Sequence, residues 1–257
     1  MTSGTTSLTV PVVDTTGTNT QITIVPAGAT TVSSMYGGTT YTDSYDAGGA
    51  QRFDNSFTFR ELAVTGLTGA YSDLVLYDPT TVSDALQYSS FGWWDRDITA
   101  NSGTTVASTF SYGLQTPVGS MPTSGTASYT GKTTGVAVYQ GGNGGYILSG
   151  SFTATADFAA NTLDAAFTNM SATNVVTGTV YDSFTNFSAA ATISGNTFSG
   201  TTASTATNPV LVTAGPYSGT IDGAFYGPSA QEIGGVWTLT TGGGAGWSAT
   251  GSFGGKQ

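Results

Sequence analysis

Short runs of alternating apolar and polar residues dominate the second half of the chain. Glycine and asparagine turns separate them, for example at Gly141–Gly145 and Gly195–Asn196. Thr, Ser, Gly and Val occupy most positions, and they disfavour helix interiors. The pattern predicts about eight meandering strands, which fit either an up-and-down barrel or a two-sheet sandwich. We expect them at residues 126–130, 135–140, 146–158, 162–169, 175–184, 190–198, 218–226, 233–240 and 247–253.

Residues 1–118 are interpreted as a separate β-rich domain, and residues 119–257 as the domain of meandering strands. Residues 7–26 are typical of an edge hairpin, because Pro11 cannot donate to a strand ladder. Residues 117–122 begin and end with proline and are predicted to link the two domains. The chain is therefore expected to be an all-β protein of two parts.

Three aromatic residues mark a strand of the first domain, Phe91, Trp93 and Trp94. Adjacent residues of a strand point to opposite faces, so the two tryptophans cannot enter one core. We assign Phe91 and Trp93 to the core of the first domain and Trp94 to the interface between the domains. A Trp94 exposed to solvent would instead indicate a binding residue.

The composition excludes several classes of function. Five Lys and Arg residues and a net charge of −10 cannot supply a surface that neutralises nucleic acid phosphates. The absence of Cys and His excludes disulfides, thiolate zinc sites and Ser-His-Asp catalysis. No apolar run is long enough for a transmembrane helix. A non-catalytic protein is therefore expected, although a two-carboxylate glycosidase using Glu61 or Glu232 stays formally open.

A tract rich in tyrosine and glycine, residues 35–45, is the candidate ligand surface of the first domain. Tyr36, Tyr41 and Tyr45 would give large contact area at a small entropic cost. Trp94 joins them as a candidate ligand-binding residue. The alternative interpretation of residues 35–45 is a plain pair of edge strands. Asp43, Asp46, Asp95 and Asp97 are candidate calcium ligands, but carboxylates of solvated turns fit their spacing better.

Glu232 is one of two glutamates and lies in a corner bounded by glycines. We expect it to be buried, with its carboxylate accepting backbone N–H bonds from its own turn or a neighbouring loop. Gly234 and Gly235 would let another backbone approach closely. The motif around this corner comprises Phe225, Tyr226, Gly227, Pro228, Glu232, Gly234 and Gly235.

Several ordered motifs resemble the transferrin-binding-protein-like solute-binding family. They are Phe91-Gly-Trp-Trp94, Tyr112-Gly-x-x-Thr-Pro117, residues 121–131, Phe225-Tyr-Gly-Pro-x-Ala-x-Glu-Ile-Gly-Gly235 and residues 251–257. The resemblance favours the barrel over the sandwich. It implies an N-terminal β-rich handle domain and a C-terminal eight-stranded antiparallel β-barrel.

The resemblance also implies a function. Proteins of this family are exported to the bacterial surface, at the outer membrane, or into the medium. They capture iron sources such as transferrin, haem proteins or haem, so a small-molecule or protein ligand is expected here. Haem would need Tyr or Met as its axial ligand, because the chain has no His. The alternative is a structural or adhesive protein that self-assembles, in which residues 1–25 could serve as a donor strand.

Overall fold

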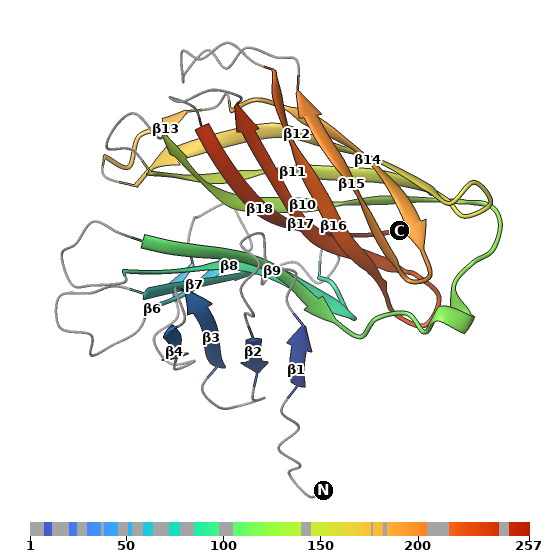
Figure 1. The fold of residues 1–257 in the computed structure, drawn as a ribbon, viewed down its shortest axis with the longest axis horizontal. Coiled ribbons are helices and arrows are strands. Elements are labelled where there is room, and N and C mark those ends of the chain that lie inside the picture. Colours follow the sequence, from blue (N-terminus) through green and yellow to red (C-terminus); the bar gives the residue numbers. More distant parts are fainter. Residues whose placement is uncertain are drawn as a thin grey trace, which may run out of the picture.

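The computed structural model shows an all-β chain (Figure 1). Up to residue 73 the description covers the backbone alone. No α-helix occurs in the described ranges, and the 3₁₀ turn η2 spans Val118–Ser120. The described residues are 8–11, 21–24, 30–36, 39–45, 51–52, 59–63, 72–77, 85–97, 105–139, 145–175, 177–181, 184–204, 216–241 and 247–257.

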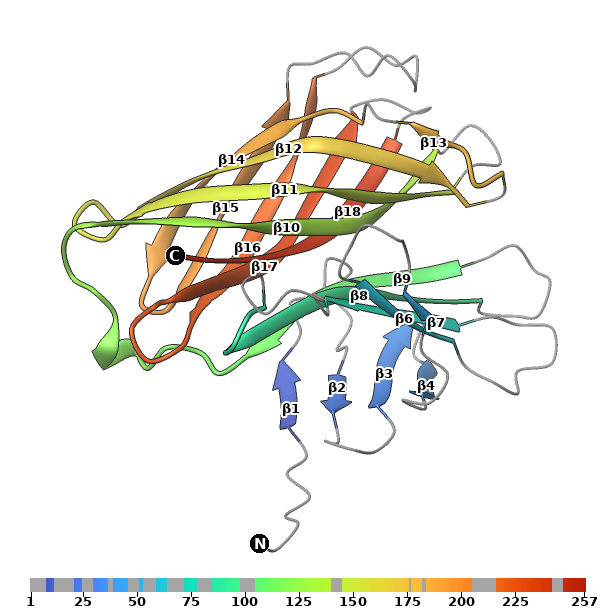
Figure 2. The same cartoon turned by 180° about the vertical axis from the view of Figure 1, so that it is seen from behind.

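Eight antiparallel strands form a closed barrel, as the sequence and the resemblance predicted. The sheet order is β11-β10-β18-β17-β16-β15-β14-β12, and the pairing of β11 with β12 closes it (Figure 2). Closure removes the free edges that an open sheet would expose. A short extra strand, β13 (Val180–Tyr181), extends β12. The barrel strands are β10 (Thr126–Tyr139), β11 (Gly145–Asp157), β12 (Thr162–Asn174), β14 (Phe187–Ser194), β15 (Thr197–Ser204), β16 (Tyr217–Tyr226), β17 (Glu232–Thr241) and β18 (Trp247–Lys256).

The barrel differs from the predicted strand limits at three places. Within the expected strand 175–184, the described residues Val175, Thr177, Gly178 and Thr179 belong to a turn, and only β13 (Val180–Tyr181) is strand. Residues 126–130 and 135–140 belong to one continuous strand, β10. The expected strand 190–198 spans two strands, β14 and β15, because the turn at Gly195 and Asn196 divides it. Strand β15 was missed because its inward positions carry Phe198, Gly200, Thr202 and Ser204, which give little apolar alternation.

Alternation along the strands fills the barrel with side chains. In β14, residues 187, 189, 191 and 193 are buried while the residues between them are exposed. Phe167 stacks on Phe187 at 4.4 Å between ring centroids, and Phe152 lies 4.4 Å from Phe253. Trp237 packs against Phe187 at 4.8 Å. The lumen is therefore a packed aromatic core, as expected for a barrel of this size.

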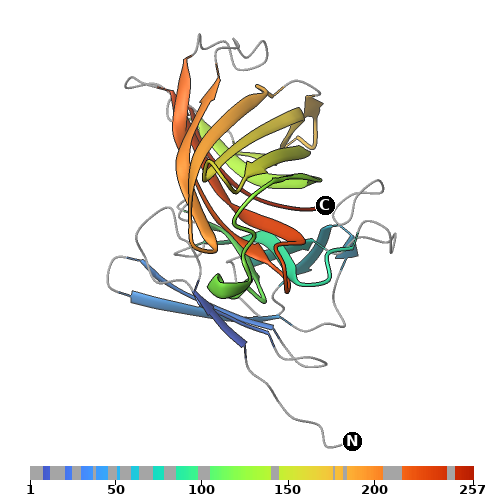
Figure 3. The same cartoon turned by 90° about the vertical axis from the view of Figure 1, so that its right-hand side faces the viewer.

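The first part of the chain forms two further antiparallel sheets (Figure 3). Strands β8 and β9 bring the second of these sheets against β17 and β18 of the barrel. This arrangement confirms the predicted fold class of a β-rich N-terminal part and a barrel, while the domain boundary between residues 118 and 119 stays a prediction. The sheets contain β1 (Leu8–Pro11), β2 (Gln21–Ile24), β3 (Thr30–Tyr36) and β4 (Thr39–Tyr45), and β5 (Gln51–Arg52), β6 (Phe59–Ala63), β7 (Ser72–Tyr77), β8 (Ser89–Asp97) and β9 (Thr105–Gly113).

The tryptophan assignment from the sequence is wrong about the face that meets the barrel. Trp93 donates from Nε1 to Oγ1 of Thr134 at 3.2 Å, so Trp93 faces the barrel. Phe91 lies on the same side against Gly254, whose missing Cβ would sit 2.5 Å from Phe91 Cδ1. Trp94 is completely buried on the opposite face, in register with Leu74. The rings of Phe91 and Trp93 line the junction because small barrel residues such as Gly254 leave space for them there.

Candidate functional site

A buried carboxylate joins the barrel to the chain before β8. Glu232 is 2% exposed and accepts hydrogen bonds from the backbone N–H groups of Gln87, at 2.5 Å, and Tyr88, at 3.0 Å. It also accepts one from the hydroxyl of Ser89 at 2.8 Å. This is the arrangement expected from the sequence, with a neighbouring segment as the donor. Charged acceptors of this kind form stronger bonds than neutral ones.

The turn before Glu232 is held by side chains from the residues that follow β9. Thr116 donates from Oγ1 to the carbonyl of Gly227 at 2.7 Å and accepts from the N–H of Ala230 at 3.2 Å. Gly227 has a φ of +85°, which a residue with a side chain rarely adopts. Pro228, which follows it, is exposed. The Tyr226 and Ser111 hydroxyl oxygens lie 3.1 Å apart.

Other residues of the motif serve packing. Phe225 is fully buried in the lumen, with its ring centroid 5.6 Å from that of Phe158. A Cβ on Gly235 would lie 2.3 Å from the Asp222 carbonyl oxygen, and one on Gly234 would lie 3.2 Å from Tyr226 Cε2. The close approach expected at these two glycines is therefore present. The geometry gives this motif a structural part in the turn and the junction.

The two ends of the barrel differ in their connections. At one end, here called the short-turn end, residues 158–161, 195–196 and 227–231 join adjacent strands. At the other, the long-loop end, residues 140–144, 175–186, 205–216 and 242–246 make the connections. Loops carried by a rigid scaffold are where binding residues concentrate. The long-loop end is therefore the candidate contact surface.

Strand β8 of the second sheet is directed towards the same end. Ser89, at the start of β8, bonds Glu232 near the short-turn end. Trp93 bonds Thr134 halfway along the barrel. Strand β8 therefore runs towards the long-loop end (Figure 1).

Three exposed valines lie at the long-loop end, Val138, Val175 and Val180. Val138 lies in β10, Val175 in the turn directly after β12, and Val180 in β13. Sequence reasoning missed them, because a valine in a strand is usually buried. Their only signal was their position next to glycine and asparagine turns.

The sequence-predicted ligand residues lie in two different sheets, with Tyr36, Tyr41 and Tyr45 in the sheet of β1–β4 and Trp94 in the sheet of β5–β9. Trp94 is buried, so a ligand would reach it only if the residues covering it moved. Tyr36, Tyr41 and Tyr45 lie in β3 and β4, and their side chains fall outside the described residues. The β3–β4 register pairs Tyr36 with Thr39 and Ser34 with Tyr41, which gives a hairpin backbone. Their binding role stays a prediction.

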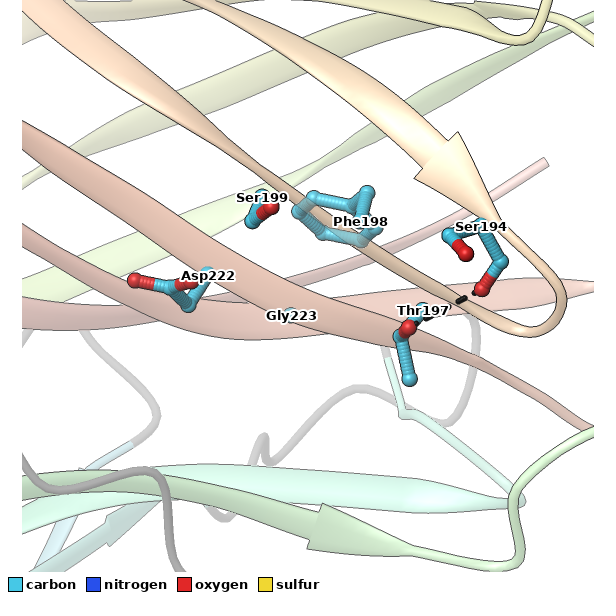
Figure 4. Close-up of a pocket in the computed structure, with 6 residues that line it drawn as sticks. All are labelled: Ser194, Thr197, Phe198, Ser199, Asp222 and Gly223. Carbon is cyan, nitrogen blue, oxygen red and sulfur yellow. Dashed lines mark hydrogen bonds between the residues drawn. The ribbon is translucent and has the colours of Figure 1, made fainter.

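A shallow depression of about 190 Å³ lies over β14, β15 and β16 (Figure 4). Asp222 and the hydroxyl groups of Ser194, Thr197 and Ser199 line it. Burial raises the pKa of the Asp222 carboxyl above its usual value. One carboxylate is too few for a two-carboxylate hydrolase.

The described part of the chain shows neither a metal-binding cluster nor a membrane-spanning helix. There, no three His, Cys, Asp or Glu side chains gather in a way that could hold a metal ion. Among the same residues, no helix has the length and apolar character needed to cross a membrane. Of the candidate calcium ligands, Asp95 belongs to no such cluster, while Asp46 and the side chains of Asp43 and Asp97 lie outside the described residues.

Comparison with known proteins agrees with the motifs and the fold. Residues 121–257 match the family described as C-lobe and N-lobe beta barrels of Tf-binding protein B. No curated protein sequence matches the chain. A variant of transferrin-binding protein B from Haemophilus parasuis Hp5 shares 16% identity and a TM-score of 0.56, over 93% of this chain and 53% of that one.

A second solved structure contains both lobes of such a protein. Intact Ap-TbpB, described as N and C lobes, shares 15% identity and a TM-score of 0.54, over 93% of this chain and 54% of that one. The chain thus spans about half the length of these proteins. At these identities the likeness shows the fold. The family match over residues 121–257, more than half of the chain, shows that the protein belongs to the family of transferrin-binding protein B β-barrels.

Proposed function

We propose that this chain is a non-catalytic bacterial protein, exported to the cell surface or the medium, that captures a protein carrier of iron. The carrier proposed is a transferrin, because the structural relatives are named for binding it. The proposed contact surface is the long-loop end of the barrel. The observation that carries the proposal is that the two longest connections of the barrel, residues 175–186 and 205–216, lie at the same end.

The packed lumen supports a protein partner over a small solute held inside the barrel. Phe152, Phe167, Phe253 and Trp237 are fully buried there and contact one another or neighbouring rings. A ligand in the lumen would have to displace these rings, which would cost several kcal/mol. A partner at the rim displaces none of them.

The pairing of the first strand favours capture over assembly. Strand β1 pairs with β2 from Leu8 with Ile24 to Pro11 with Gln21. A protein that polymerises by strand donation is expected to leave such a segment unpaired. The adhesive alternative therefore lacks its donor strand among the described strands.

The test uses the absence of cysteine from the chain. Thr177→Cys places one thiol on the exposed β12–β13 turn at the long-loop end, and Ala160→Cys places one at the short-turn end. Each variant is coupled to a maleimide polyethylene glycol, and binding of iron-loaded transferrins from several vertebrates is measured on immobilised protein. We expect saturable binding that the polymer blocks at residue 177 and leaves intact at residue 160. Absence of binding to every transferrin would overturn the proposal.

Haem is the alternative ligand within the same proposed function, and it would bind to the tyrosines of β3 and β4. The β3–β4 register places positions 36, 41 and 45 on one face of the hairpin backbone. If they hold haem, titration gives a saturable Soret band that Tyr41→Ala removes. If they do not, the Soret band of free haem is unchanged by the protein.

A further inference from the structure

A single carboxylate interrupts the outer wall that β14, β15 and β16 form. Asp222 is the only Asp, Glu, Lys or Arg among the residues of these three strands. It points outwards, because Ile221 beside it on β16 is buried in the core of the barrel and adjacent residues point to opposite faces. The outward-facing residues of β14 and β15 are all Ser, Thr or Ala. The wall is therefore a neutral surface with one negative charge.

This carboxylate lies in the shallow depression of about 190 Å³ (Figure 4). Two cross-strand pairs build the depression, Ser194 with Thr197 and Ser199 with Asp222. Residues that lie directly opposite each other on antiparallel strands have Cβ atoms about 4.5–5.5 Å apart. The Ser199 hydroxyl and the Asp222 carboxylate are therefore close enough to contact one bound group together.

The polar groups of the depression keep their capacity to accept hydrogen bonds. Among the residues that the structure describes, none donates a hydrogen bond to the Asp222 carboxylate or forms an ion pair with it. The Ser194 and Ser199 hydroxyls also have no partner there. Thr197 Oγ1 donates to the Ser194 carbonyl at 3.0 Å, and its lone pairs remain able to accept. The depression thus offers one charged acceptor surrounded by hydroxyl acceptors.

The place of Asp222 beside the sheet–barrel junction explains why its carboxylate has lost water. Its neighbour across β17 is Val236, which is buried on the outer face of the barrel. Ser252, in register with Val236, donates to the Gly92 carbonyl at 2.7 Å, so the second sheet covers the wall there. Burial raises the pKa of Asp222, because the charged form is disfavoured unless a cation joins it. A partly buried charge without a partner is typical of functional sites.

The chemistry of the depression selects among ligands. An anion would be repelled by the carboxylate. A calcium ion takes about six to eight oxygen ligands, more than one carboxylate and the hydroxyls beside it supply. The Phe198 ring is 2% exposed, so it offers no face on which a sugar ring or a nucleobase could stack. An ammonium group brings one positive charge and several N–H donors, which match the carboxylate and the hydroxyl acceptors.

We propose that the depression binds the ammonium group of a lysine side chain on a polypeptide partner, with Asp222 as its counter-ion and Ser199 as a second acceptor. A guanidinium fork would occupy both carboxylate oxygens and leave the hydroxyls without a donor. A free polyamine would leave its other ammonium groups above a wall that has no second carboxylate. The site goes beyond the proposed function, because it lies on the outer wall and not at the long-loop end.

The test is a titration of the isotope-labelled chain followed by the NMR shifts of its backbone amides. The probe is N-acetyl-lysine methylamide, and it is compared with its side-chain acetylated form, with the corresponding arginine derivative and with spermidine. Asp222→Asn removes the proposed counter-ion and should fold, because burial disfavours the charge that it removes. Asp164→Asn is the matched control, because Asp164 is exposed on β12, outside the depression, and the substitution removes the same charge.

We expect saturable shifts centred on the amides of Ser199, Asp222 and Gly223. The affinity should fall at least about tenfold in Asp222→Asn and on acetylation of the probe, and stay within about twofold in the control. It should also fall between about 0.05 and about 0.5 M NaCl, because salt screens an ion pair at the surface. No saturable shift at about 50 mM probe, equal binding by Asp222→Asn, or tighter binding of the arginine derivative or spermidine would overturn the proposal. Since no transferrin is used, either result leaves the test of the proposed function separate.

Discussion

Replacing Glu232 by Gln tests the junction directly. The carboxylate accepts two backbone N–H bonds and one hydroxyl bond, from Gln87, Tyr88 and Ser89. Glutamine keeps one acceptor oxygen and turns its NH₂ group towards donors, so at least one buried N–H loses its partner. Loss of a hydrogen bond to a charged group costs about 1.5–3 kcal/mol. For a domain of this size, that predicts a fall in melting temperature of about 3–12 °C.

Thermal unfolding followed by circular dichroism measures this fall, with Asp164→Asn as the control for charge. Asp164 is exposed on β12 and loses the same charge without touching the junction. Hydrogen exchange supplies a local readout, because the Gln87 and Tyr88 amides should lose protection in the Glu232 variant. A melting temperature within about 1 °C of the parent would show that these bonds contribute little, and the structural role of Glu232 would be wrong.

Three further changes give separate outcomes. Gly254→Val should destabilise the protein by about 1–3 kcal/mol in denaturant melts, because the new Cβ would lie 2.5 Å from Phe91 Cδ1. Gly119→Val is the control, because a Cβ on Gly119 meets no atom within 4 Å. Equal destabilisation by the two substitutions would refute the close packing at Gly254. Burial raises the pKa of Asp222, so its ionisation disfavours folding and stability is lost as pH rises from the unfolded value of 3.8 through the folded one. Asp222→Asn should therefore melt higher than the parent at pH 7 and equally at about pH 3, and a lower melting temperature at pH 7 would contradict this. Burial also raises the pKa of Tyr129 to about 12 from 10.0, so stability should fall between these pH values, and Tyr129→Phe should remove that fall.

Turn chemistry and alternation were enough to predict most of the barrel. Glycine and asparagine at the hairpins, with apolar residues at every second position, indicated eight strands. They could not separate barrel from sandwich, because closure depends on the pairing of β10 with β18, the first and last barrel strands, which no local pattern encodes. The motif resemblance supplied that choice. The burial of Glu232 was predictable because an isolated carboxylate between glycines has few other roles.

Other features depended on contacts between distant segments. Because Trp93 and Trp94 are adjacent, the sequence showed that they point to opposite faces of the strand. Which of the two faces meets the barrel depends on Thr134 and Gly254, which are far along the chain. The exposed valines Val138, Val175 and Val180 were missed for the same reason. Val175 directly follows β12 in a turn, and where a strand ends depends on its partners rather than on its own sequence.

The pairing of β10 with β18 sets a condition on biosynthesis. Thr130 pairs with Lys256, and Tyr139 pairs with Trp247, so the first barrel strand waits for the last one. On the ribosome, β10 therefore has one unpaired edge until nearly the whole barrel has been translated. Contacts so distant in sequence close slowly, and an open strand edge in that interval invites pairing with another nascent chain. We expect refolding yield to depend strongly on protein concentration, and a circular permutant that joins β18 to β10 by a short loop to relieve that dependence.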